Sequence, residues 1–270
     1  MGKVVLVTGA SSGIGKEAAK MFIQKGYTVY GASRRMEKMG DLQEVGVHLL
    51  EMDLTDEVSM VAGVEEILRK ENRIDILVNN AGYGSFGALE DVPISEARIQ
   101  FEVNIFGLAR LSQLVLPAMR RQHSGRIINI SSIGGSLGQP HGAWYHATKY
   151  AVEGLSDSLR MELKQFGIDV VIIKPGAIVT EWNTIARENL IKVSGNTVYQ
   201  NLARKHVKML IQADQRGSLP GVVARTIVRA AICKRPKIRY ATGGGAKIIL
   251  FAKKILSDRM FDRVMLSLMR

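Results

Sequence analysis

The chain has 270 residues, of which 46% are hydrophobic and 23% charged, with a net charge of +12, a composition typical of a globular protein with a large core. Its single cysteine, Cys233, excludes an internal disulfide and a cysteine-built metal site, which favours a reducing, cytoplasmic compartment. No linker, repeat or signal-peptide pattern is recognisable, and no apolar run reaches the roughly 18 residues of a membrane-spanning helix, so we expect one domain over residues 1–270.

Short apolar runs rich in Val and Ile alternate along the chain with segments of helical spacing. The expected strands span 3–9, 27–33, 47–53, 74–82, 125–132 and 168–176, and the expected helices span 13–25, 56–71, about 94–121 and the region around 144–155. These strands are apolar on both faces, which is typical of a parallel sheet covered on both sides. The sequence therefore predicts a doubly wound, Rossmann-type α/β fold that binds ligands beyond the carboxyl ends of its strands.

The first strand is followed by the turn TGASSGIG, residues 8–15. Gly9, Gly13 and Gly15 would permit a tight turn, close approach of the backbone to a phosphate, and tight packing of the helix on the strand. The N-terminus of the following helix adds unpaired N–H groups and a partial positive charge. Because this turn lies between a strand and a helix at the start of an alternating chain, it indicates a site for a dinucleotide diphosphate.

The second strand ends in Ser33, followed by Arg34 and Arg35. NAD sites usually place an acidic residue here, which accepts hydrogen bonds from the ribose 2′-hydroxyl. A carboxylate would repel a 2′-phosphate, whereas a guanidinium binds it with charge-assisted hydrogen bonds. Two solvated arginines at the start of a helix are the alternative, but the missing acid favours NADP(H).

Three further strand ends carry candidate contacts to a cofactor. Asp53 closes the third strand, where its carboxylate could accept from an adenine amino group or could cap the helix that follows. The fourth strand ends in NNAG, residues 79–82, whose glycine leaves the backbone free to touch a cofactor. Pro175 and Gly176 end the sixth strand, and Thr180 follows at a position to meet a carboxamide.

Tyr145 and Lys149 lie four residues apart in a helical segment, which places both side chains on one face of the helix. An isolated Tyr–Lys pair of this kind usually lies at the protein surface and has no functional role. Ser132, however, ends the fifth strand thirteen residues before the tyrosine.

Together, the TGxxxGIG turn, NNAG, Ser132, the YxxxK pair, Asn104 and PGxxxT resemble the short-chain dehydrogenase/reductase family over about residues 3–180. The segments NNAGYGSFGALEDV, FEVNIFGLAR and DRMFDRVM are most similar to its 17β-hydroxysteroid-dehydrogenase-like branch. The predicted catalytic residues are Asn104, Ser132, Tyr145 and Lys149. The predicted cofactor site comprises Gly9, Ser11, Ser12, Gly13, Ile14, Gly15, Ser33, Arg34, Arg35, Asp53, Leu54, Asn80, Ala81, Gly82, Tyr145, Lys149, Pro175, Gly176 and Thr180.

Reduction of a ketone needs a hydride at carbon and a proton at oxygen. A free phenol has a pKa near 10, and we expect Lys149 and the oxidised nicotinamide to lower that of Tyr145 by about three units, so that it acts as acid or base. Ser132 would hydrogen-bond the same substrate oxygen. The resemblance further implies that Lys149 bonds the nicotinamide ribose and that Asn104 holds a water linking Lys149 to solvent.

These residues predict an NADP(H)-dependent oxidoreductase that interconverts a ketone or aldehyde and an alcohol. A catalytically silent NADP(H)-sensing protein on the same fold is the alternative, although a sensor needs none of the four catalytic residues. Four apolar residues expected near the site, Phe86, Leu137, Trp144 and Trp182, suit a bulky hydrophobic substrate resembling a steroid, a retinoid or an acyl chain, but core packing explains them equally well. His141 and His146 are expected in the pocket wall or at the surface, and no metal site is predicted.

The last third of the chain carries the excess charge: residues 181–270 hold 18 Lys and Arg against 5 Asp and Glu, a net of +13. Residues 181–218 are the expected substrate lid. The tail, residues 246–270, predicts two short amphipathic helices, which would pack on the protein's own body, on another subunit of a homodimer or homotetramer, or on an anionic membrane. Nucleic-acid binding has no support beyond the charge itself.

Overall fold

The computed structural model describes residues 2–269, in which seven parallel strands form one sheet. The strand order is β3-β2-β1-β4-β5-β6-β7, and every neighbouring pair is parallel. The strands are β1 (Val4–Thr8), β2 (Thr28–Ser33), β3 (His48–Glu51), β4 (Ile76–Asn79), β5 (Gly125–Ile130), β6 (Ile168–Pro175) and β7 (Arg239–Thr242). The predicted single-domain, doubly wound α/β fold is therefore confirmed.

The helices are α1 (Gly13–Gln24), α2 (Gly40–Glu44), α3 (Glu57–Glu71), α4 (Ile94–Phe101), α5 (Leu108–Arg121), α6 (Ala143–Leu163), α7 (Glu181–Ser194), α8 (Gln200–Gln215), α9 (Pro220–Ile232), α10 (Ala246–Ile255) and α11 (Asp258–Ser267). Short 3₁₀ turns span Met36–Lys38, Ile133–Gly135 and Lys164–Phe166. Among residues 2–269, none of the helices combines the length and the apolar character needed to cross a bilayer.

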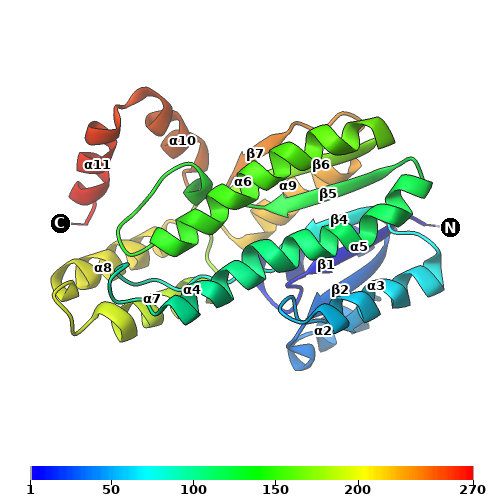
Figure 1. Ribbon diagram of the computed structural model, residues 1–270, viewed down its shortest axis with the longest axis horizontal. Coiled ribbons are helices and arrows are strands. Elements are labelled where there is room, and N and C mark those ends of the chain that lie inside the picture. The colour runs from blue at the N-terminus through cyan, green and yellow to red at the C-terminus, as the bar shows by residue number, and fades with distance from the viewer. Residues whose placement is uncertain (1, 270) are drawn as a thin grey trace.

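Helices cover both faces of the sheet (Figure 1). Val5 and Val7 of β1 point into a core with α1, α2 and α9, whereas Val4 and Leu6 point into a second core with α3 and α5. All four side chains are fully buried, because successive residues of a strand point to opposite faces. A strand buried on both faces has little room for polar groups along its length, so the polar residues gather where the strands end.

β7 is not predicted by the sequence. Its segment, RYAT, has only four residues, begins with an exposed arginine and lacks a run of Val or Ile. It becomes a strand because Arg239 and Tyr240 pair with Ile172 and Ile173 of β6 at the edge of the sheet.

The helical region expected at about 94–121 is confirmed but contains a π-helical turn at Glu102–Gly107, between α4 and α5. A Cβ added at Gly107 would lie 2.4 Å from the carbonyl oxygen of Leu54, so the helix packs closely on the loop after β3. The π turn contains Asn104, and single π turns inside helices are frequent at functional sites.

The two predicted tail helices are present as α10 and α11, and the Ser257 hydroxyl accepts from the Met260 N–H at the start of α11. Phe261 and Met265 of α11 bury against Leu137, in the loop after β5. Of the two explanations left open for Leu137, core packing is the one observed: this side chain belongs to a small core beneath the tail.

The apolar stripe of α10 faces solvent, with Ile248 exposed by 76%, Phe251 by 63% and Ile255 by 64%. The opposite face of this helix carries Ala246, which is buried, and Ile249, which packs on the core beneath the tail. The protein's own body therefore covers part of α11 and leaves the stripe of α10 uncovered.

Candidate cofactor and catalytic site

A cleft of about 440 Å³ lies at the carboxyl ends of the strands. Its lining includes every predicted site residue except Gly15 and Asn104, and it draws on the ends of β1 to β6 and the start of α7. Residues as far apart in the chain as Gly9 and Thr180, which are 171 positions apart, thus meet in one depression. The parallel sheet explains this convergence, since all its strands end at the same edge.

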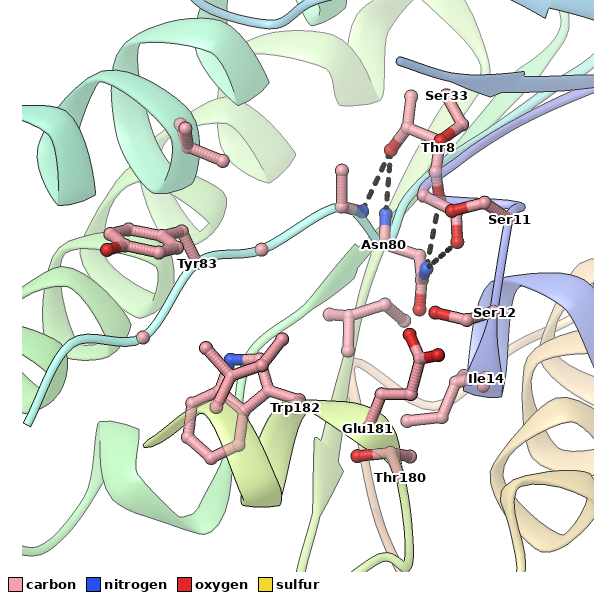
Figure 2. Close-up of a pocket in the computed structure, with 18 of the residues that line it drawn as sticks. Thr8, Ser11, Ser12, Ile14, Ser33, Asn80, Tyr83, Thr180, Glu181 and Trp182 are labelled. Carbon is pink, nitrogen blue, oxygen red and sulfur yellow. Dashed lines mark hydrogen bonds between the residues drawn. The ribbon is translucent and has the colours of Figure 1, made fainter. Parts of the chain in front are cut away.

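The glycine-rich turn is held tightly beneath this cleft. Gly9 and Gly13 have positive φ values of 67° and 54°, which favour glycine. A Cβ at Gly15 would lie 2.4 Å from both the Gly9 carbonyl oxygen and Asn80 Nδ2, so Gly15 permits close packing and does not line the cleft. Figure 2 shows Asn80 bonded to Thr8: Asn80 Nδ2 donates to the Thr8 carbonyl at 2.9 Å, and the Asn80 N–H donates to the Thr8 hydroxyl at 3.0 Å.

The end of β2 presents two arginines to the cleft. The Ser33 hydroxyl accepts from the Arg35 N–H at 3.1 Å, which turns the chain so that both guanidinium groups reach the cleft. Arg34 is 66% exposed and lies 3.6 Å from the Asp53 carboxylate. A guanidinium so lightly engaged is available to an anionic group of a ligand.

Asp53 does not cap the following helix. Asp56 does, because its carboxylate accepts from the Val58 N–H at 3.0 Å. Asp53 instead accepts from the N–H and the hydroxyl of Thr55, both at 2.9 Å. Burial acts to raise the pKa of Asp53, but the Thr55 hydrogen bonds and nearby Arg34 outweigh it and lower the pKa. The carboxylate is therefore ionised, as an acceptor for an adenine amino group would be.

Tyr145 and Lys149 lie on α6 at the inner part of the cleft. Lys149 Nζ donates to the Ile130 carbonyl at 3.0 Å and lies 5.8 Å from the centroid of the Tyr145 ring. Burial lowers the pKa of Lys149 to about 8, although Glu153 opposes the shift. Burial also raises the pKa of Tyr145, against a hydrogen bond from Ser132 that lowers it.

In the protein by itself, burial thus raises the pKa of the phenol, and the lowering expected from Lys149 and an oxidised nicotinamide together stays a prediction. Desolvation disfavours phenolate more than the Ser132 hydrogen bond favours it. Tyr145 is consequently a neutral phenol near pH 7, which is the form that can donate a proton to an oxygen.

Asn104 does not line the cleft but braces its wall. Its Oδ1 accepts from the Tyr83 N–H at 2.8 Å, and its Nδ2 donates to the Tyr83 carbonyl at 2.8 Å and to the Thr148 hydroxyl at 3.1 Å. The side chain thus joins the π turn to the loop after β4 and to α6. The water expected between Asn104 and Lys149 stays a prediction.

Two of the predicted apolar residues cover Tyr145. The ring centroids of Phe86 and Trp182 lie 5.6 and 5.1 Å from that of the tyrosine, and Trp182 belongs to the first turn of α7. Trp144 packs instead against Phe101, 6.3 Å away between centroids, and is absent from the cleft lining. Of the two explanations left open for Trp144, packing away from the site is the one observed, since its side chain leaves α6 beside α4.

Neither predicted histidine lies at the surface. His146 Nδ1 bonds to the Gly134 carbonyl at 2.9 Å and its Nε2 accepts from the Gln139 N–H at 3.1 Å, so it braces the loop after β5 as a neutral ring. His141 Nδ1 lies 3.1 Å from His206 Nδ1, which ties α8 to the start of α6 behind Phe86. Burial lowers the pKa of His206 to about 4, with His141 and His146 adding to the shift. Both members of this pair are therefore neutral near pH 7.

Sequence reasoning missed two residues that shape this site. Thr8 braces the end of β4, as described above, and the T of TGxxxGIG could have signalled it. Glu181 lines the cleft and contacts Arg35, and only its position directly after Thr180 offered a signal. Within residues 2–269, no group of His, Cys, Asp and Glu is arranged to hold a metal ion.

The family model of the short chain dehydrogenases matches residues 3–190. A 3-ketodihydrosphingosine reductase from Bacteroides thetaiotaomicron is 37% identical over 93% of this chain and 91% of its own, and an NADPH-dependent 3-dehydrocapnine reductase from Ornithobacterium rhinotracheale is 34% identical over 97% and 95%. The crystal structure of a short-chain dehydrogenase from Streptomyces avermitilis matches 99% of this chain and 95% of its own, with 34% identity and a TM-score of 0.79.

The chain therefore belongs to the short-chain dehydrogenase family and is an oxidoreductase that acts on carbonyl and alcohol groups. The family resemblance read from the sequence is confirmed. The 17β-hydroxysteroid-dehydrogenase-like branch stays a prediction.

The lowered pKa of Lys149 predicts a loss of activity in alkaline solution. The lysine gives up its proton as the pH rises through about 8, while Tyr145, whose pKa is raised, stays protonated there. We expect kcat/KM for carbonyl reduction to be constant below this pKa and to fall about tenfold per pH unit above it. Circular dichroism at each pH serves as a control for unfolding, and a folded enzyme with a flat profile up to pH 10 (about two units above) would contradict the assignment.

Proposed function

We propose that this protein is an NADP(H)-dependent reductase of a ketone on a long, largely apolar molecule, with Tyr145 as the proton donor. The observation that carries the proposal is the position of the phenol: it lines the cleft with Ser132, Lys149 and Trp182, and its ring packs against those of Phe86 and Trp182. A polar proton donor below an apolar cover suits a carbonyl group attached to an apolar chain.

The cofactor is NADP(H). The cleft fits a dinucleotide, because the glycine-rich turn leaves backbone where side chains would block a diphosphate, and Arg34 and Arg35 stand where a 2′-phosphate would bind. One relative is named an NADPH-dependent reductase, which agrees with this charge pattern. When bound, NADPH would supply the hydride.

Side chains of the protein would transfer the proton to the substrate oxygen. Tyr145 donates its phenolic proton to the carbonyl oxygen, and the Ser132 hydroxyl bonds the same oxygen and stabilises the charge that develops on it. Lys149, held by the Ile130 carbonyl, places a positive charge beside the phenolate that is left. Asn104 keeps the wall of the site in place through Tyr83 and Thr148.

The substrate class rests on two supports. The helices α7 and α8, the expected lid, add Ala186, Leu190 and Ala203 to the apolar cluster around Phe86, against which Tyr145 packs. Two relatives are named reductases of a 3-keto and a 3-dehydro compound, the first of them 3-ketodihydrosphingosine. We therefore narrow the bulky hydrophobic substrate expected from the sequence to a ketone on a long-chain lipid.

The exposed surface of the tail would govern where in the cell the enzyme works. The tail presents Ile248, Phe251 and Ile255 to solvent beside the exposed ammonium groups of Lys247 and Lys254. An apolar stripe flanked by cations is complementary to an anionic bilayer, where a lipid ketone would be dissolved. Figure 1 shows the tail at the same end of the molecule as α7 and α8. We therefore propose peripheral contact of α10 with such a membrane.

A homodimer or homotetramer stays a prediction. Several apolar side chains are exposed on adjoining helices and would suit a contact between copies: Ile99 of α4, Phe106 of the π turn, and Tyr150 and Met161 of α6. These lie on other elements than the exposed stripe of α10, so both contacts could form together.

Turnover tests the function. The purified protein with NADPH should reduce 3-ketodihydrosphingosine faster than a 17-ketosteroid or retinal, and Tyr145→Phe should lower kcat about 10²- to 10⁴-fold while leaving the cofactor Kd nearly unchanged. Only the ionisable oxygen is lost in this variant. Near-normal turnover by Tyr145→Phe would remove the assigned role. NADPH binding without turnover of any ketone in the wild type would favour the silent sensor.

Cofactor choice tests the arginines. Ser33→Asp combined with Arg34→Ala should shift the ratio of kcat/KM for NADPH and NADH towards NADH by about 10- to 100-fold, because repulsion replaces charge-assisted bonds at the 2′-phosphate. Arg69→Ala, which removes an exposed arginine from α3, is the matched control and should leave the ratio unchanged. A wild type that already prefers NADH would overturn the assignment.

Vesicle co-sedimentation tests the membrane contact. The wild type should bind vesicles containing an anionic phospholipid at low salt, more weakly as salt rises, and Ile248→Ser with Phe251→Ser should remove most of the binding. Val58→Ser on α3, where the valine is also 76% exposed, is the control and should bind as the wild type does. Cutting the chain at Gly245 is a poorer test, since it uncovers Leu137. Unchanged vesicle binding by the double variant would overturn the membrane contact of α10. A smaller oligomer in the double variant would assign the stripe to a contact between subunits.

A further inference from the structure

The cationic end of β2 is held by a carboxylate from the lid. Arg35 Nη1 donates to Glu181 Oε2 at 3.2 Å, and Lys38 Nζ donates to Glu181 Oε1 at 3.1 Å. Arg35 Nη2 also donates to the hydroxyls of Ser11 and Ser12 in the glycine-rich turn, at 3.2 and 3.1 Å. Figure 2 shows the Glu181 carboxylate close to Ser12, within the cleft. Arg35, which we assigned to the 2′-phosphate of the cofactor, thus already has an anionic partner, the Glu181 carboxylate.

We propose that Glu181 is a tethered competitor of the cofactor's 2′-phosphate, so that NADP(H), and not NAD(H), releases the first turn of α7. This inference rests on the NADP(H) preference proposed above. A phosphate carries more charge than a carboxylate and offers more acceptor oxygens to a guanidinium. The ion pair it would replace is half-exposed, and such pairs are weak. A 2′-phosphate would therefore displace the carboxylate, whereas a 2′-hydroxyl would not.

The displaced residue is directly connected to the catalytic tyrosine. Trp182 follows Glu181 in the chain, and its ring lies 5.1 Å from that of Tyr145 between centroids. A Cβ added at Gly84 would lie 2.1 Å from the Trp182 ring, so this indole also rests against the loop after β4. Loss of the Glu181 contact would remove one of the contacts that hold the first turn of α7, leaving the Trp182 ring and the bond from Asn183 Nδ2 to the Ile178 carbonyl at 2.7 Å. The cover over Tyr145 could then move and admit the substrate.

Glu181 would accordingly act at two points of the reaction. It would weaken the binding of a cofactor that must displace it from Arg35, so NADPH gives up some affinity but releases the cover, whereas NADH does neither. It would also order the steps, with cofactor before substrate, because only the phosphorylated cofactor frees the cover. The residue is a positioning and specificity residue, since it touches neither the carbonyl group nor Tyr145.

Two small nucleotides can separate these effects from catalysis. Adenosine 2′,5′-bisphosphate carries the 2′-phosphate, and adenosine 5′-monophosphate lacks it. Trp182 is a built-in reporter once Trp144 is replaced by Phe, a mild change because the buried Nε1 of Trp144 has no hydrogen-bond partner. In Trp144→Phe protein, the bisphosphate should change the Trp182 fluorescence and the monophosphate should not.

Glu181→Gln in the same background provides the decisive comparison. Calorimetry should show bisphosphate binding tightened by about two- to fivefold, as expected for the loss of a half-exposed ion pair, with monophosphate binding unchanged. The fluorescence of the free variant should already resemble that of the bound wild type. Glu188→Gln removes the same charge from an exposed site on α7 and should behave as the wild type does.

The outcomes distinguish the inference from the function on which it rests. If the wild type binds the bisphosphate no better than the monophosphate, the NADP(H) preference itself fails, and the competition fails with it. If the bisphosphate binds better but Glu181→Gln matches Glu188→Gln in affinity and fluorescence, the NADP(H) preference stands and the competition is overturned.

Discussion

All seven strands run in one direction, and most of their side chains are buried on both faces of the sheet. This constraint governs the rest of the molecule. Apolar packing fills the strands, so polar groups are left to the positions where the strands stop, and parallel strands all stop at one edge. The Thr8 hydroxyl, which accepts from the N–H groups of Asn80 and Ala81, joins the ends of β1 and β4 there. The cleft is the direct result of this arrangement.

Burial also sets the chemistry of the proposed proton donor. It raises the pKa of the Tyr145 phenol and lowers that of the Lys149 ammonium, because a site of low polarity disfavours both charged forms. The Ile130 carbonyl offsets part of the cost of holding an ammonium there. The protein by itself thus holds a neutral acid next to a cation whose pKa is about 8. That state suits reduction, in which the oxygen of the substrate must gain a proton.

The last third of the chain adds charge and apolar surface to this same end of the molecule. Its acidic residues are few, and one of them, Glu181, contacts two cations at the end of β2. Its basic residues flank the exposed stripe of α10. The two features act at the same end of the molecule. At one side of the cleft, a cofactor phosphate would compete with Glu181 for Arg35. The tail offers an apolar surface to the membrane in which a lipid substrate would be dissolved.

The sequence alone determined the alternating strands and helices. A strand covered on both faces must be apolar throughout, and such a run of apolar residues can be recognised in the sequence. It also determined most of the cleft lining, since residues that close parallel strands share an edge whatever lies between them. Only the tertiary structure decided the rest. β7 became a strand by pairing with β6, Leu137 and Trp144 pack in other cores, and burial raises the pKa of Tyr145 in the protein by itself. Each of these outcomes depends on contacts with residues that are distant in the chain. A local sequence pattern does not indicate which distant residues will surround a side chain.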